Sequence, residues 1–118
     1  MARVAYDTFF GVAGIVLLCV SIYVAFIRED IPDCANSENP ALCYTMYLEG
    51  ALERQGVAAA LESLAAVYVT DREFSTYCHG NVHDIGKAAY KIYHATGKVE
   101  ITELASYCGF GYYHGFME

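Results

Sequence analysis

The stretch REFSTYCHGNVHDIGKAAYKIYHA, residues 72 to 95, decides the fold of this chain because it carries a clear helical pattern. At about 100° per residue, its apolar side chains gather on one side of a helix and its charged side chains on another. The apolar stripe consists of Phe74, Cys78, Val82, Ile85, Ala89 and Ile92, and the polar sector of Glu73, Asp84, Lys87 and Lys91. The pattern predicts one long amphipathic helix, capped by Asp71 and stopped by Gly97.

Three further helices are predicted around it, at about 40–54, at 57–69 and from Thr102 onward. Asn39 places a capping residue before a proline at the first helical position, and Gly56 ends the helix that follows. Outside the first thirty residues no stretch alternates apolar and polar residues for six positions, as a half-buried strand would. We therefore expect an all-α domain of about four helices, arranged as helical hairpins.

An uncharged apolar run, FFGVAGIVLLCVSIYVAFI, occupies residues 9 to 27. At about 1.5 Å per residue, a helix of this length nearly spans a hydrocarbon core of roughly 30 Å. A cleaved signal peptide is the alternative, but the run is long for one and no small-x-small cleavage site precedes Arg28. The sequence predicts a transmembrane anchor at 1–28, a juxtamembrane linker at 29–39 and a small Cys/His domain at 40–118.

Cysteine usage predicts the side of the membrane on which the domain lies. Cys34, Cys43, Cys78 and Cys108 form an even set outside the apolar run, which favours an oxidising compartment and two disulfides. We expect a single-pass protein of the cell membrane with a cytoplasmic amino terminus and an extracytoplasmic domain; four reduced cytosolic thiols are the alternative. Cys34–Cys43 with Cys78–Cys108 is the favoured pairing, and Cys43–Cys78 with Cys34–Cys108 stays open.

A seam of histidines runs between the apolar stripe and the polar sector of residues 72–95. It consists of His79, His83, Gly86, Tyr90 and His94. Near the end of the chain, His114 and Glu118 also stand one helical turn apart. If the last two helices form an antiparallel hairpin turning near Gly97, His79 lies opposite Phe116 and His83 opposite Tyr112.

This register predicts a metal site made of His79, His83, His114 and Glu118. Three imidazoles and a carboxylate suit zinc, and a set of histidines alone suits copper. Asp84 and Tyr90 are candidate partners that orient the rings.

Three other uses of the same residues stay open. The histidines can serve the structure alone, by hydrogen-bonding a carbonyl or one of the 11 tyrosines. A haem would be held without covalent attachment, because the chain has no CxxCH motif. The glycine-rich run from Gly109 to Gly115 can instead let aromatic residues pack closely against another helix.

Residues 82–87, Val-His-Asp-Ile-Gly-Lys, resemble the His-Asp signature of the HD phosphohydrolase family, whose members bind metal through paired His and Asp on helices. In that family, an upstream histidine and a downstream aspartate complete the site. Here the only earlier histidine is His79 and no aspartate follows Asp84. We therefore do not assign the chain to this family.

The apolar run carries a stripe of mostly small residues: Gly11, Gly14, Leu18, Ser21 and Ala25. Small residues let membrane helices approach each other, so the stripe predicts contact with other membrane-protein subunits within the bilayer. The formal charge of −7 argues against binding of nucleic acid, whose phosphates need a basic face.

Together these features predict a small single-pass accessory subunit of a membrane complex, with an extracytoplasmic, disulfide-stapled helical domain that carries a candidate metal site. The alternative is an independent membrane-anchored protein that binds or transfers zinc or copper. Catalysis by this chain alone is not expected, because no nucleophile–base pair and no phosphate-binding loop stands out.

Overall fold

The computed structural model describes Gly14, Val16, Leu17, Cys19 and residues 30–118. The chain divides into two units, Met1–Asp30 and Ile31–Glu118, and the second is the helical domain. The expected anchor lies almost wholly outside the described residues, as do Gly11, Ser21 and Ala25 of its small-residue stripe, while Gly14 is helical and exposed. Within the described part of the chain, no helix is long and apolar enough to cross a membrane.

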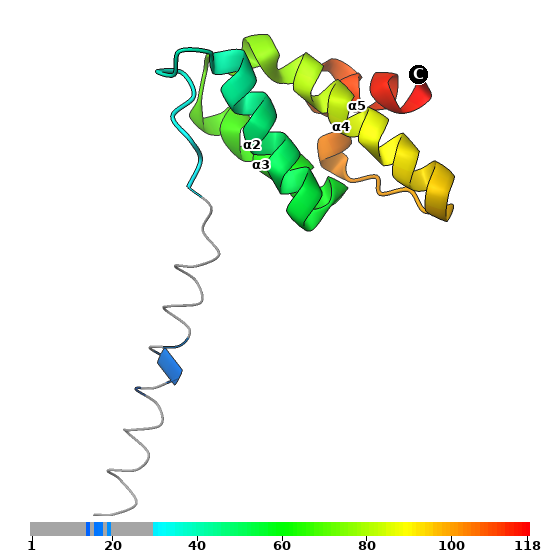
Figure 1. Cartoon of the computed structure of the whole chain (residues 1–118), viewed down its shortest axis with the longest axis horizontal. Coiled ribbons are helices and arrows are strands. Elements are labelled where there is room, and N and C mark those ends of the chain that lie inside the picture. Colours follow the sequence, from blue (N-terminus) through cyan, green and yellow to red (C-terminus); the bar gives the residue numbers. More distant parts are fainter. Residues whose placement is uncertain (1–13, 15, 18, 20–29) are drawn as a thin grey trace, which may run out of the picture. The chain divides into compact units, whose positions relative to one another are not determined.

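Residues 30–118 are helical and contain no strand, so the all-α prediction is confirmed for this part of the chain. The elements are α2 (Pro40–Gln55), α3 (Val57–Thr70), α4 (Ser75–Thr96), the 3₁₀ helix η1 (Glu103–Ser106) and α5 (Tyr107–Met117) (Figure 1).

Helices α2 and α3 form a hairpin whose ends follow the local sequence signals. The side-chain oxygen of Asn39 accepts a hydrogen bond from the Leu42 amide, and Pro40 occupies the first turn of α2. Gly56, with φ of 90°, joins the two helices, and its amide donates to the Leu52 carbonyl. A positive φ is open to glycine at little steric cost, so this residue permits the tight reversal.

Helix α4 begins three residues later than Asp71 and Arg72 predict. The Asp71 side chain accepts a hydrogen bond from the Glu73 amide at 2.9 Å, but it caps a turn rather than α4 itself. This turn carries Phe74, which is fully buried. At the other end, the left-handed Gly97 (φ 71°) stops α4 as predicted.

The core lies where α2, α3 and α4 meet. Its buried apolar residues include Leu48, Leu61, Leu64, Val67 and five of the six predicted for the α4 stripe. The sixth, Ile92, is 42% exposed, so its prediction as a core residue is wrong. The reason is the length of the helices. Helix α4 has 22 residues and α2 has 16, so at about 1.5 Å per residue α4 is roughly 9 Å longer and α2 does not cover its end.

Tyr44 joins this core to the turn before α4. Its ring packs edge-on against Phe74 at 4.9 Å between centroids, and its hydroxyl donates a short hydrogen bond to the Asp71 carboxylate. Burial, together with this carboxylate, raises the pKa of the Tyr44 hydroxyl above its usual range, so the hydroxyl remains a donor.

Removing that hydroxyl in Tyr44→Phe is expected to lower the free energy of unfolding by about 2 kcal/mol, because a buried hydrogen bond to a charged group is lost. Urea denaturation followed by circular dichroism measures the change. Tyr47→Phe is the matched control, since Tyr47 is half-buried on the same helix and makes no side-chain hydrogen bond to another described residue. Equal effects of the two changes would contradict the assignment.

The last two helices do not form the predicted antiparallel hairpin. Their backbone contacts advance in the same direction along both helices: Gly111 lies against the His79 carbonyl, and Gly115, one turn later, lies against the His83 carbonyl. Helix α5 therefore runs in the same general direction as α4 (Figure 1). The predicted pairs of His79 with Phe116 and of His83 with Tyr112 are wrong for this reason.

The connection from Gly97 to η1 explains the difference. Residues 98–102 form no helix and run back along the domain, where the Glu100 carbonyl accepts a hydrogen bond from the Tyr112 hydroxyl at 2.6 Å. The Glu100 carboxylate also accepts from the Ala58 amide at 3.2 Å. Extended chain covers about 3.3 Å per residue, twice the rise of a helix, so five residues return past about three turns of α4.

Candidate functional site

The structure brings together the four residues predicted to bind metal, which we call the histidine cluster: His79, His83, His114 and Glu118. The rings of His79 and His83 lie 6.4 Å apart between centroids, and those of His79 and His114 lie 5.5 Å apart. The Glu118 carboxylate lies 3.2 Å from Nε2 of His83. The cluster thus forms one surface site on the edge shared by α4 and α5.

A left-handed turn at the start of α5 carries the chain to this site. Cys108, Gly109 and Phe110 have φ values of 55°, 68° and 60°, which only glycine adopts freely. The predicted fourth helix from Thr102 is therefore interrupted, and its regular part begins after Phe110. The disulfide between Cys78 and Cys108 ties this turn to α4.

The turn also fixes His79. Nδ1 of His79 lies 2.8 Å from the Cys108 carbonyl oxygen. A carbonyl oxygen accepts only, so Nδ1 carries the proton and donates. In the neutral ring, Nε2 then keeps its lone pair.

Glu118 is shared between a histidine and a lysine of α4. One carboxylate oxygen meets Nε2 of His83, and the other lies 3.1 Å from the Lys87 ammonium. The hydrogen bond from Lys87, followed by that from His83, lowers the pKa of the Glu118 carboxyl. The side chain is 59% exposed, so this ion pair adds little to stability.

Glycines bring the backbones of α4 and α5 close together beside the histidine cluster. A Cβ on Gly111 would lie 2.8 Å from the His79 carbonyl oxygen, and one on Gly86 would lie 2.9 Å from the Tyr112 carbonyl carbon. A Cβ on Gly115 would lie 2.8 Å from the His83 carbonyl carbon and closer still to its oxygen. Gly111 and Gly115 thus let α5 lie close against α4, and His79 makes a carbonyl hydrogen bond of the kind expected of a structural histidine.

As the side chains lie, no group of three or more His, Cys, Asp or Glu among the described residues is arranged to hold a metal ion. The imidazoles are neighbours, but their nitrogens do not meet at one point. Metal binding at the histidine cluster remains a prediction. His94, the last histidine of the seam, lies apart from the cluster and contacts the Tyr90 ring.

Both favoured disulfides are present in the structure, Cys34–Cys43 and Cys78–Cys108. Cys34 is fully buried, so the folded unit includes part of the segment that the sequence predicts as a linker. Cys19 is a free cysteine.

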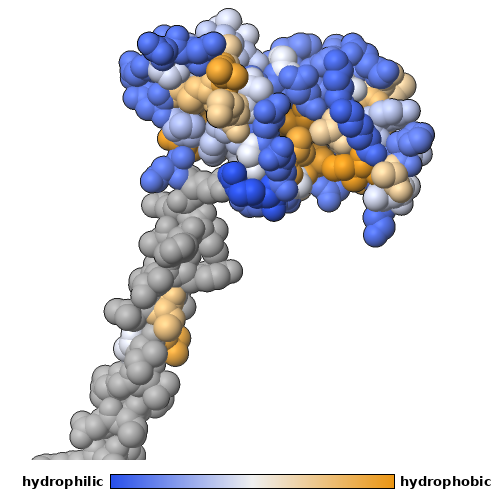
Figure 2. Space-filling view, viewed as in Figure 1, coloured by the Kyte–Doolittle hydropathy of each residue, from blue (hydrophilic) through white to orange (hydrophobic). Residues whose placement is uncertain are grey.

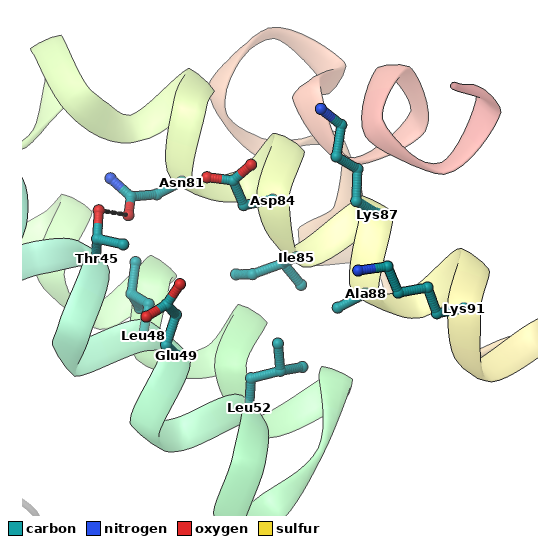
Figure 3. A pocket seen from close by; sticks show the side chains of 10 residues that line it. All are labelled: Thr45, Leu48, Glu49, Leu52, Asn81, Asp84, Ile85, Lys87, Ala88 and Lys91. Carbon is teal, nitrogen blue, oxygen red and sulfur yellow. Dashed lines mark hydrogen bonds between the residues drawn. The ribbon is translucent and has the colours of Figure 1, made fainter.

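A groove between α2 and α4 is a second site, and the sequence does not predict it. Its volume is about 350 Å³, and Figure 3 shows side chains from the two helices around it. It is lined by Thr45, Leu48, Glu49, Leu52, Asn81, Asp84, Ile85, Lys87, Ala88 and Lys91.

At one end of the groove, the buried Asn81 forms a polar link between the helices. Its side-chain oxygen accepts from the Thr45 hydroxyl at 3.1 Å (Figure 3). Its amide nitrogen donates to the Tyr77 carbonyl at 2.9 Å. Asn81 is polar yet lies beside the apolar stripe of α4. That placement is the sequence signal that points to this site.

Comparison with protein-family models, curated proteins and solved structures finds no match to this chain. A functional assignment therefore depends on the geometry of the groove and of the histidine cluster.

Proposed function

We propose that this protein is a small single-pass accessory subunit of a membrane complex, whose extracytoplasmic helical domain binds an amphipathic helix of a larger partner. The observation that carries the proposal is the apolar stripe of α4, which continues beyond the α2–α3 hairpin. On this side of α4, Ile85 is buried, Ala88 at the border of the stripe is half-buried and Ile92 is exposed.

These three residues share one face of α4, because their spacing is that of successive helical turns. Ile85 and Ala88 line the groove together with Leu48 and Leu52 of α2. The exposed Ile92 follows one turn after Ala88 on the same face of α4. A helix of a partner laid here would cover the stretch of α4 that α2 is too short to cover.

Further apolar side chains surround this end of α4. Tyr93, Val99 and Ile101 are 43%, 44% and 58% exposed. Figure 2 shows apolar surface between the α2–α3 hairpin and the end of α4, bordered by hydrophilic residues. Contiguous exposed apolar surface with a polar rim is typical of protein-interaction sites.

The rim of the groove carries charges of both signs. Glu49, Asp84 and Lys91 are exposed and make no ion pair with another described residue. Charged groups at an interface mainly select the partner and its orientation. A partner helix with an apolar face flanked by both basic and acidic residues fits this rim.

Filling the groove tests the proposal. Ala88→Leu adds bulk to the floor while keeping a strong helix former, so recovery of partner proteins with the tagged full-length chain in mild detergent should fall at least several-fold. Ala66→Leu is the matched control, because Ala66 is exposed on α3 and lines neither the groove nor the histidine cluster. Quantitative mass spectrometry of the purified material measures recovery.

Two outcomes would contradict the proposal. One is equal partner recovery with Ala88→Leu and Ala66→Leu, when circular dichroism shows both variants folded. The other is a native chain that purifies alone or only as copies of itself.

The histidine cluster favours a second candidate function, an independent membrane-anchored protein that binds or transfers zinc or copper. The observation in favour of this function is that residues far apart in the sequence meet: His79 contacts His114, and His83 contacts Glu118. Such a protein would purify without a partner and would carry metal.

A further inference from the structure

We propose that the histidine cluster binds one divalent transition-metal ion, with Cu²⁺ held more tightly than Zn²⁺, through the imidazoles of His79, His83 and His114. The Glu118 carboxylate supplies a fourth donor. The histidine cluster is separate from the α2–α4 groove except at Lys87, which lines the groove and pairs with Glu118, and metal binding there does not depend on a partner protein.

His79 is already prepared as a ligand. Its Nδ1 proton is engaged by the Cys108 carbonyl at 2.8 Å, which leaves Nε2 as the donor toward an ion. Metal-binding histidines commonly donate their other ring N–H to such a carbonyl, which fixes the tautomer and the ring orientation. The Cys78–Cys108 disulfide holds that carbonyl in place beside α4.

His83 and His114 flank this ring from two different helices. His83 stands one turn beyond His79 on the same face of α4, the i,i+4 spacing by which two histidines of one helix bind zinc. The two rings are tilted by only 28° from each other. The His114 ring approaches His79 from α5, with 5.5 Å between centroids.

In the proposed site His79 keeps its bond to the Cys108 carbonyl, and the other ligands turn toward its Nε2. His114 is exposed, and rotamer changes of exposed side chains are fast. A ligand set on two helices then links α4 to α5, in the region where the glycines already hold them in close contact.

Glu118 supplies charge as well as an oxygen. The oxygen that contacts His83 is distinct from the one that pairs with Lys87, so the carboxylate can turn toward an ion while the lysine pair persists. A donor set rich in imidazole favours copper and zinc over calcium and magnesium, and Cu²⁺ exceeds Zn²⁺ in affinity for such nitrogen sites.

The test is a titration of the full-length chain in detergent with Cu²⁺ and, separately, with Zn²⁺. Isothermal calorimetry should show one equivalent of each ion per chain. Electron paramagnetic resonance of the Cu²⁺ form should show coupling to imidazole nitrogens. His83→Ala and His114→Ala should each weaken binding at least about tenfold, because each removes one ligand.

His94→Ala is the matched control, since it removes the same side chain from the same helix outside the cluster. It should leave affinity and stoichiometry unchanged. The bound ion should also raise the midpoint of thermal unfolding of the native chain, and this shift should disappear in His83→Ala. His114→Ala keeps the inference testable if His83→Ala unfolds.

The inference is overturned if His94→Ala weakens binding as much as His83→Ala and His114→Ala do, since the ion would then be held by scattered surface histidines. It is also overturned if the native chain takes up no equivalent of either ion at about 0.1 mM free metal, because the dissociation constant would then be too weak for a built site.

Discussion

Gly115→Ala is expected to lower the free energy of unfolding of the helical domain by about 3 kcal/mol, at the upper end of the range for overpacking a well-packed interior. A Cβ at this position would lie 2.8 Å from the carbonyl carbon of His83, 3.1 Å from its Cα and closer still to its oxygen. These are backbone atoms of α4, so no side chain can rotate away to make room. Helix α5 must move, and the contact between His83 and Glu118 is then lost.

Gly80→Ala is the matched control for this change. Gly80 lies on α4 and is exposed, and a Cβ there would meet no other atom within 4 Å. Alanine in place of a helical glycine should stabilise by about 0.5–1 kcal/mol. Urea denaturation of both variants should therefore give shifts of opposite sign. A Gly115→Ala variant as stable as the native chain would show that α4 and α5 are not in backbone contact.

The boundaries that sequence predicts well are those set by local chemistry. The start of α2 follows from Asn39 and Pro40, its end from Gly56, and the end of α4 from Gly97, since caps and positive φ values act within one turn. The start of α4 shows the limit of such signals. Asp71 does accept an amide hydrogen bond, but it serves a turn that precedes the helix.

The direction of α5 lies beyond the reach of local signals. It depends on residues 98–102, whose path is set by distant partners, Ala58 on α3 and Tyr112 on α5. The left-handed turn at Cys108 and Phe110 has no local sequence signal either, because neither residue type prefers that conformation. The disulfide to Cys78 is the long-range constraint that accompanies it.

The histidine cluster nevertheless assembles, because two of its features do not depend on that direction. His79 and His83 share one face of α4 at i,i+4 spacing, and Gly86 on the same seam lets α5 approach. The groove escapes prediction because it lies between two helices, lined by α2 residues from Thr45 to Leu52 and by α4 residues from Asn81 to Lys91. No helical pattern within a single segment reports how closely a second helix packs against it.

Removal of the Cys78–Cys108 disulfide is expected to cost about 3.5 kcal/mol of unfolding free energy, and removal of Cys34–Cys43 about 2.5 kcal/mol. The difference follows from the sequence separations of 30 and 9 residues, since a bond that closes a longer loop restricts the unfolded chain more. The double changes Cys78→Ala with Cys108→Ala, and Cys34→Ala with Cys43→Ala, avoid leaving a reactive thiol in either pair.

The two disulfides should also differ in what their loss does to the folded state. Cys108 holds the left-handed turn, and its carbonyl holds His79, so the Cys78/Cys108 variant should loosen the start of α5 while α2 and α3 persist. Hydrogen exchange should report faster exchange at the amides of α5 in that variant alone. Denaturation in urea gives the two losses of stability, and thiol labelling of the native chain before and after reduction checks that both bonds are formed. Equal protection of α5 in the two variants would contradict the role assigned to Cys108, because the turn would then be held by the glycine contacts alone.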